Sequence, residues 1–165
     1  MLAPRVISSR TGIDQNPEMA RRPCKARCRL YTLIFRYYPV FTAYRLLALA
    51  KNKLRGIVAS RRISGESGER DQATPRMPIY GPHGSFVIFN RAYFEAGGSL
   101  DVGSFMFAET MFIAETLERL GLSAVYEPRL RVIHDEHVTM GRFKSPRVAR
   151  LQWEASVYCF REFFS

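Results

Sequence analysis

Residues 105–137 read FMFAETMFIAETLERLGLSAVYEPRLRVIHDEH and carry the clearest structural signal in the chain. A helical repeat of apolar residues begins near Phe107, and Gly121 ends it. Two short segments rich in strand-forming residues follow, SAVYE and LRVIHDE, with Pro128 between them as a turn residue. The pattern predicts a helix followed by two strands.

One acid lies where this helix should be apolar. The stripe that repeats about every 3.6 residues comprises Glu109, Phe112, Ile113, Thr116, Leu117 and Leu120, whereas Glu115, Glu118 and Arg119 fall mostly outside it. Two interpretations are open. An acid in the first turn is stabilised by the helix dipole and needs no other role. Alternatively, the carboxylate lines a cleft and accepts a proton there.

Composition and charge limit the class of protein. The 165 residues are 47% hydrophobic and 13% aromatic, enough for one domain with a core. The net charge of +10 is uneven, because residues 1–62 hold 14 Lys plus Arg against 2 acids, while residues 63–165 hold 11 against 13. Such a basic first third predicts an anionic partner, either nucleic acid or a phospholipid surface.

The segment LYTLIFRYYPVFTAYRLLALA, residues 30–50, narrows that choice. Arg36, Pro39 and Arg45 interrupt its apolar residues and argue against a membrane span. Two short amphipathic helices lying among anionic lipid headgroups fit the pattern, and so do helices packed on the rest of the fold. Nucleic acid is not favoured, since no recognisable nucleic-acid-binding motif accompanies the charge. We therefore assign residues 1–59 to a basic amphipathic helical segment.

The first ten residues, MLAPRVISSR, lack the apolar core and cleavage site of a secretory signal. We expect a cytoplasmic protein, which is either free in the cytoplasm or attached peripherally to the inner face of the plasma membrane. Cys24, Cys28 and Cys159 are too few for a disulfide framework, and the three histidines are too far along the chain to predict a zinc site with them.

The remainder divides into a loop and a compact domain. Residues 60–78, rich in Ser, Gly, Pro and charge, predict a flexible loop, and residues 79–165 predict the folded part. Within it, GSFVIFN (residues 84–90) predicts a strand covered on both faces, and RAYFEAGG predicts a short helix closed by two glycines. Residues 145–164 predict a last helix with Ser145 as its cap and Pro146 at its first position.

Over residues 79–140 the chain resembles a known family. YGPHGSFVIFNRAYFEAGGSLD and then FMFAETMFIAETLERLGLSAVYEPRLRVIH resemble the family-two inverting nucleotide-sugar glycosyltransferases of the GT-A type, and most closely the bacterial branch that builds capsule and lipopolysaccharide, including rhamnosyltransferase-like proteins. Weaker echoes, GIDQNP and RRP, precede this region. The resemblance implies an α/β fold corresponding to the C-terminal, acceptor-side half of a GT-A domain, preceded here by the basic helical segment.

The resemblance also implies a set of site residues. The catalytic base of the family is a carboxylate at the start of the acid-bearing helix, commonly in a Glu-Asp pair, which matches Glu109 followed here by Thr110; a further family acid is replaced by Phe112. His134 matches a histidine near the metal or diphosphate, with His137 as the alternative. The implied substrate-binding residues are Gly84, Ser85, Asp101, Thr110 and His137.

The implied partners are a nucleotide-sugar donor and a glycan or lipid-linked acceptor, with Mg²⁺ or Mn²⁺ as the metal of the complete family. No Asp-x-Asp occurs in the chain, and its first 78 residues show no βαβ pattern of the kind that binds the donor. We therefore expect an acceptor-side half, produced by truncation, a split gene or a misplaced start. The alternatives are a non-catalytic, membrane-associated remnant or partner subunit, and a basic nucleic-acid-binding module.

Overall fold

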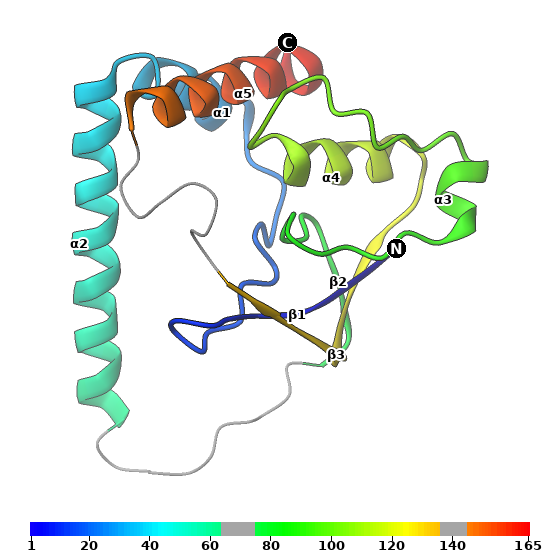
Figure 1. The fold of residues 1–165 in the computed structure, drawn as a ribbon, viewed down its shortest axis with the longest axis horizontal. Helices are drawn as coiled ribbons and strands as arrows, with labels where there is room; N and C mark the ends of the chain where they lie inside the picture. The colour runs from blue at the N-terminus through cyan, green and yellow to red at the C-terminus, as the bar shows by residue number, and fades with distance from the viewer. Residues whose placement is uncertain (64–74, 136–144) are drawn as a thin grey trace.

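The computed structural model describes residues 1–63, 75–135 and 145–165, with side chains described as far as Lys51 in the second helix. Within these ranges the fold is mixed α/β, which confirms the class predicted from the sequence. The elements follow in the order β1 (Leu2–Ser8), α1 (Lys25–Ile34), α2 (Tyr38–Ile63), β2 (Met77–Ile79), α3 (Arg91–Glu95), α4 (Glu109–Arg119), β3 (Ala124–His134) and α5 (Pro146–Phe164) (Figure 1).

The strands form one mixed sheet in the order β1-β3-β2, with β1 parallel and β2 antiparallel to β3. The prediction of a helical segment over residues 1–59 is therefore wrong for residues 2–8, which share a sheet with the later part of the chain. Ala3, Val6 and Ile7 are buried, as expected for a strand covered on both faces. The basic charge around this short apolar run obscured it.

β3 is one strand where two were predicted. Pro4 pairs with Glu127 and the next residue, Arg5, pairs with Arg131, so β3 has extra residues at this point and forms a bulge. Pro128 lies in the bulge, where its missing N–H breaks no regular ladder bond. The strand changes direction within its length (Figure 1), so the proline bends β3 without ending it.

The predicted strand over residues 84–90 does not form. Ile88 alone makes a bridge, with both of its backbone hydrogen bonds to Leu2 at 2.9 Å. Phe86 and Ile88 are exposed, whereas Val87 and Phe89 pack against the core beside the sheet. The continuous apolar character of residues 84–90 predicts burial on both faces, but only one face of this segment is covered.

The helix signals after residue 90 are confirmed. α4 ends before Gly121, which has a φ of 65°, and α3 is followed by Gly97 with a φ of 93°, a region that favours glycine. Pro146 occupies the first turn of α5, and the Ser145 side chain accepts a hydrogen bond from the Val148 N–H at 3.4 Å.

The predicted pair of N-terminal helices is also present, but its second member is long. α1 packs against α5, and α2 contacts α1 and α5 at one end while the rest of it extends away from the domain (Figure 1). Pro39 lies in the first turn of α2, which tolerates proline. The predicted loop over residues 60–78 is wrong at both ends, since α2 reaches Ile63 and β2 begins at Met77, and residues 64–74 lie outside the described ranges.

α4 lies between two apolar clusters. Ile113 and Leu117 join the cluster beside the sheet, which includes Tyr93 and Tyr126, whereas Met111 joins the cluster against α1 and α5. The buried surface of α4 is therefore much wider than the predicted stripe, and it comprises Thr110, Met111, Ile113, Ala114, Glu115 and Leu117. Glu115 was placed outside the stripe by the sequence pattern, and that placement is wrong.

Glu115 is buried but fully paired. Arg22 Nε and Nη2 donate to its two carboxylate oxygens at 2.7 and 2.8 Å, and the Tyr80 hydroxyl donates to one of them at 2.5 Å. Burial alone raises the pKa of this carboxyl, but the hydrogen bonds from Arg22 and Tyr80 outweigh it, and the pKa lies below its usual value. A charged side chain is thus retained in the middle of the domain.

A second paired acid makes stability depend on pH. Glu127, at the bulge of β3, accepts hydrogen bonds from Arg129 Nε and Nη2 at 2.7 and 2.9 Å. These bonds, with Arg76 nearby, lower the pKa of Glu127 from 4.5 to about 2. Because the folded-state pKa is the lower one, the stabilisation is fully present above pH 4.5 and is lost as the pH falls towards about 2.

We predict that the free energy of unfolding falls across this acidic window and that Glu127→Gln makes the fall shallower. Urea titrations at a series of pH values measure it. Glu95→Gln, which removes an exposed acid paired with Arg91 on α3, is the matched control and should leave the pH dependence unchanged. Identical pH profiles for the Glu127 variant and the unmodified protein would contradict the prediction.

Candidate functional site

Three of the predicted site residues line one cleft. Gly84 and Ser85, from the loop after β2, line a cavity of about 330 Å³ together with Glu109 at the start of α4. Its remaining walls are apolar and comprise Phe86, Val87, Phe89, Leu100, Val102, Phe112 and Ile113. Residues more than 20 positions apart in the sequence therefore line one cavity.

Glu109 occupies the first position of α4 and is half-buried. Ala108, the preceding residue, has no side chain that can cap the helix, so the unpaired N–H groups of the first turn and the helix dipole favour a negative charge at this position. The backbone at Phe107 has a φ of 69°, which is rare for a residue other than glycine. Such outliers concentrate at functional sites.

Two other predicted residues do not line the cleft. Thr110 is buried and its hydroxyl donates to Glu18 Oε2 at 2.8 Å, so its side chain serves a structural contact. Asp101 is exposed between Leu100 and Val102, and its N–H donates to Ser99 Oγ at 2.9 Å. His137 lies outside the described residues.

His134 ends β3 and belongs to a polar cluster next to the cleft. Its Nδ1 lies 2.8 Å from Gln15 Oε1, and its ring meets the ring of His83 edge-on with centroids 5.3 Å apart. His83 Nδ1 lies 2.8 Å from Ser85 Oγ. The cluster therefore connects the end of the parallel strand pair to the loop that forms one wall of the cleft.

The sequence reasoning missed His83, Gln15 and Asn16. The buried Asn16 side chain donates to the Pro4 carbonyl oxygen at 2.7 Å and accepts from the His83 N–H at 2.7 Å, which fixes the loop against β1. The GIDQNP echo was the available signal for these contacts. Its meaning depended on β1, whose strand conformation was not predicted.

Gly81 allows the close approach of three segments. It exchanges two backbone hydrogen bonds with Met19, at 2.9 and 3.0 Å. A Cβ on Gly81 would lie 2.9 Å from Met19 Cβ and 3.0 Å from Thr110 Cγ2, whereas a Cβ on Gly84 would meet Glu109 Cβ at an ordinary 3.5 Å. Glycine is therefore required at position 81 by packing, and position 84 has room for a methyl group.

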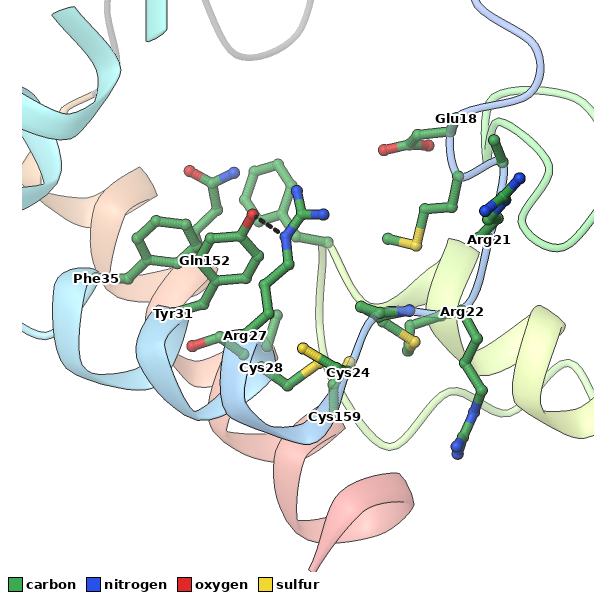
Figure 2. A pocket seen from close by; sticks show the side chains of 17 residues that line it. Glu18, Arg21, Arg22, Cys24, Arg27, Cys28, Tyr31, Phe35, Gln152 and Cys159 are labelled. Carbon is green, nitrogen blue, oxygen red and sulfur yellow. Dashed lines mark hydrogen bonds between the residues drawn. The ribbon is translucent and has the colours of Figure 1, made fainter. Parts of the chain in front are cut away.

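A larger cavity, of about 650 Å³, lies beyond the first turn of α4, among α1, α5 and the segment before α1 (Figure 2). Phe107 and Met111 of the α4 region line it, so the start of α4 separates the two cavities. Arg27 Nε donates to the Tyr31 hydroxyl at 2.8 Å within it. The side-chain oxygen of Gln152, Oε1, is buried at the wall of this cavity and has no hydrogen-bond partner in the described structure.

Two of the three cysteines that line this larger cavity are buried thiols. Cys24, Cys28 and Cys159 all line it as free cysteines, and Cys28 and Cys159 are buried. Burial raises the pKa of the Cys159 thiol to about 12. This side chain is therefore a protonated thiol at neutral pH and a poor nucleophile.

The expected divalent metal does not fit the described site residues. Among residues 1–63, 75–135 and 145–165, no three His, Cys, Asp or Glu side chains group together in a way that could hold a metal ion. In the histidine cluster both Nδ1 atoms are already engaged, by Gln15 and Ser85, and Mg²⁺ and Mn²⁺ prefer oxygen ligands.

Comparison of the chain with protein-family models, curated proteins and solved structures finds no match. The cleft must therefore be judged by its own chemistry. It offers one carboxylate, a serine hydroxyl next to an imidazole, and apolar walls. A carboxylate held beside such a cavity can accept a proton from a bound hydroxyl.

We predict that Gly81→Ala destabilises the protein by about 1 to 3 kcal/mol, because the new methyl group overpacks the contact with Met19 and Thr110. Gly84→Ala is the matched control, and its stability should change by less than about 0.5 kcal/mol. Urea unfolding midpoints of the two variants measure the difference. Equal effects of the two substitutions would refute the packing assigned to this loop.

Proposed function

We propose that the chain is the acceptor-side half of a GT-A type glycosyltransferase and that the 330 Å³ cleft binds the acceptor hydroxyl. The observation that carries this proposal is that Glu109, Gly84 and Ser85 line the same cleft. The sequence resemblance assigned substrate contacts to the same three residues. The volume lies at the small end of ligand sites, which suits a single sugar unit of an acceptor.

Glu109 acts as the general base in this proposal. The acceptor hydroxyl donates its proton to the carboxylate while its oxygen attacks the anomeric carbon of the nucleotide sugar. The bond from that carbon to the nucleoside diphosphate breaks on the opposite face, so the configuration inverts. A positioned base of this kind contributes about 10² to 10⁴ in rate.

The neighbouring residues orient the acceptor. Gly84 presents no side chain, so a sugar ring can approach the backbone of the loop. Ser85 Oγ, held by His83 at 2.8 Å, can exchange a hydrogen bond with a second hydroxyl of the acceptor. Phe112 and Ile113 of α4 supply apolar walls against the sugar ring and reduce the access of water, which would otherwise compete as the nucleophile.

The donor requires protein groups that the cleft does not supply. The described site has one carboxylate and no cluster that could hold a metal against a diphosphate. In this proposal the nucleotide sugar is bound by a donor-binding unit that meets the open side of the cleft. The transfer assay therefore uses the chain together with such a unit, and acceptor binding is measured on the chain alone.

We predict that Glu109→Gln leaves folding and acceptor binding nearly unchanged and slows sugar transfer by about a hundredfold or more, because only the base is lost. Binding is measured by ligand-observed NMR with a panel of methyl glycosides, and turnover by transfer to the same glycosides. A role limited to the helix dipole would instead cost about 0.3 to 1 kcal/mol of stability with turnover per folded molecule intact.

Two further variants complete the experiment. Ser85→Trp fills the cleft and should abolish glycoside binding, whereas Glu95→Gln, which changes an exposed acid on α3, should alter neither readout. Full turnover of the Glu109 variant would remove this residue from the mechanism. Failure of every glycoside to bind the unmodified chain would contradict the assignment of the cleft as an acceptor site.

A further inference from the structure

The region around α1 and α2 has a one-sided charge. Between Met19 and Gly65 the sequence contains 12 Lys and Arg residues and no Asp or Glu. In the described part of this region Lys25, Arg29, Arg36 and Lys51 are exposed. Such a surface attracts anionic partners and repels cationic ones.

The same helices leave large apolar side chains in solvent. Leu47 is 71% exposed and Leu46 62%, values far from those of core leucines. Among the side chains of these helices that the structure describes, the exposed large aliphatic residues are Leu30, Leu33, Val40, Leu46, Leu47 and Leu49. Scattered apolar residues are normal on a surface, but a concentration on two consecutive helices marks an interaction site.

These exposed residues are not needed to pack α1 against α2. The inner surfaces of α1 and α2 are already joined by edge-to-face ring contacts, with Tyr31 to Tyr44 at 6.1 Å and Phe35 to Phe41 at 5.4 Å between centroids. Phe41 is 2% exposed. At about 100° per residue, Val40, Leu46 and Leu47 fall on the half of α2 opposite Phe41, and Leu49 lies just outside the edge of that half.

We propose that the outer surface of α1 and of the first half of α2 docks on a membrane that contains anionic phospholipid. The leucines enter the boundary between headgroups and acyl chains, and the exposed basic residues contact lipid phosphates. Arg36 lies with its guanidinium 5.5 Å from the ring centroid of Tyr37, and this pairing of cation and aromatic side chain suits the interface.

The two features together favour a membrane over nucleic acid. Contacts with phosphate groups account for the basic residues whether the partner is a membrane or nucleic acid. Burial of the exposed leucines, in contrast, gains free energy only where these side chains leave water. Among the described residues no helix combines the length and the hydropathy needed to cross a bilayer. In this proposal the helices attach through a surface contact, which depends on both lipid charge and apolar burial.

Vesicle sedimentation of the intact chain tests the proposal. The protein should pellet with vesicles of phosphatidylcholine and phosphatidylserine, should bind pure phosphatidylcholine weakly, and should be released by high salt. Leu47→Glu should weaken binding by about tenfold or more, because it replaces an apolar group that the bilayer would bury with a negative charge. Ile13→Glu, at a side chain 66% exposed outside these helices, is the matched control and should bind normally.

A second pair of variants separates the local surface from the net charge. Arg29→Gln with Arg36→Gln should weaken vesicle binding by about tenfold or more, whereas Arg91→Gln with Arg161→Gln, which removes the same charge from α3 and α5, should have little effect. Circular dichroism checks that every variant is folded. Equal binding to neutral and anionic vesicles, no binding to either, or equal losses in both pairs would overturn the proposal. Binding to duplex DNA that survives Leu47→Glu, without vesicle binding, would overturn it in favour of nucleic acid.

Discussion

The arrangement of this fold depends on the hydrogen bonds that pair the buried carboxylate of Glu115. An unpaired carboxylate in this position between two apolar clusters would be costly, and Arg22 and Tyr80 supply hydrogen bonds to both of its oxygens. Arg22 also places its guanidinium 4.7 Å from the ring centroid of Phe164 at the end of α5. One polar group thus joins the segment before α1, the segment after β2, α4 and α5.

This network also determines where the cleft forms. Tyr80 immediately precedes Gly81, whose backbone pairs with Met19 only three residues before Arg22. Both paired segments are therefore held against α4, and the loop that follows carries His83, Gly84 and Ser85 to the first turn of the same helix. Glu115 holds the loop at one point of α4 and Glu109 faces it at another. The proposed base and the proposed acceptor-binding loop are ordered by a single helix.

Features of the fold that depend on a few neighbouring residues were predictable from the sequence. Features that depend on packing between distant segments were not. Gly97, Gly121 and Ser145 marked helix ends correctly because their effects act within a few residues. β1 was missed because its strand character appears only when it pairs with β3, more than a hundred residues away. Glu115 was misplaced because a single stripe assumes that a helix buries one side, whereas α4 packs on two. The resemblance assigned Gly84, Ser85 and Glu109 to one site. The histidine cluster could not be predicted, because it forms only when β1 pairs in parallel with β3.

A double-mutant cycle on Arg22 and Glu115 tests the central claim most directly. Arg22→Met alone should lower the free energy of unfolding by about 2 to 3 kcal/mol, towards the lower end of values for broken buried pairs because the arginine is partly exposed. Adding Glu115→Met should then restore much of that loss, because no unpaired charge remains, so the two substitutions should couple by more than about 1 kcal/mol. Simple additivity of the two effects in urea unfolding would contradict the claim that this ion pair organises the fold.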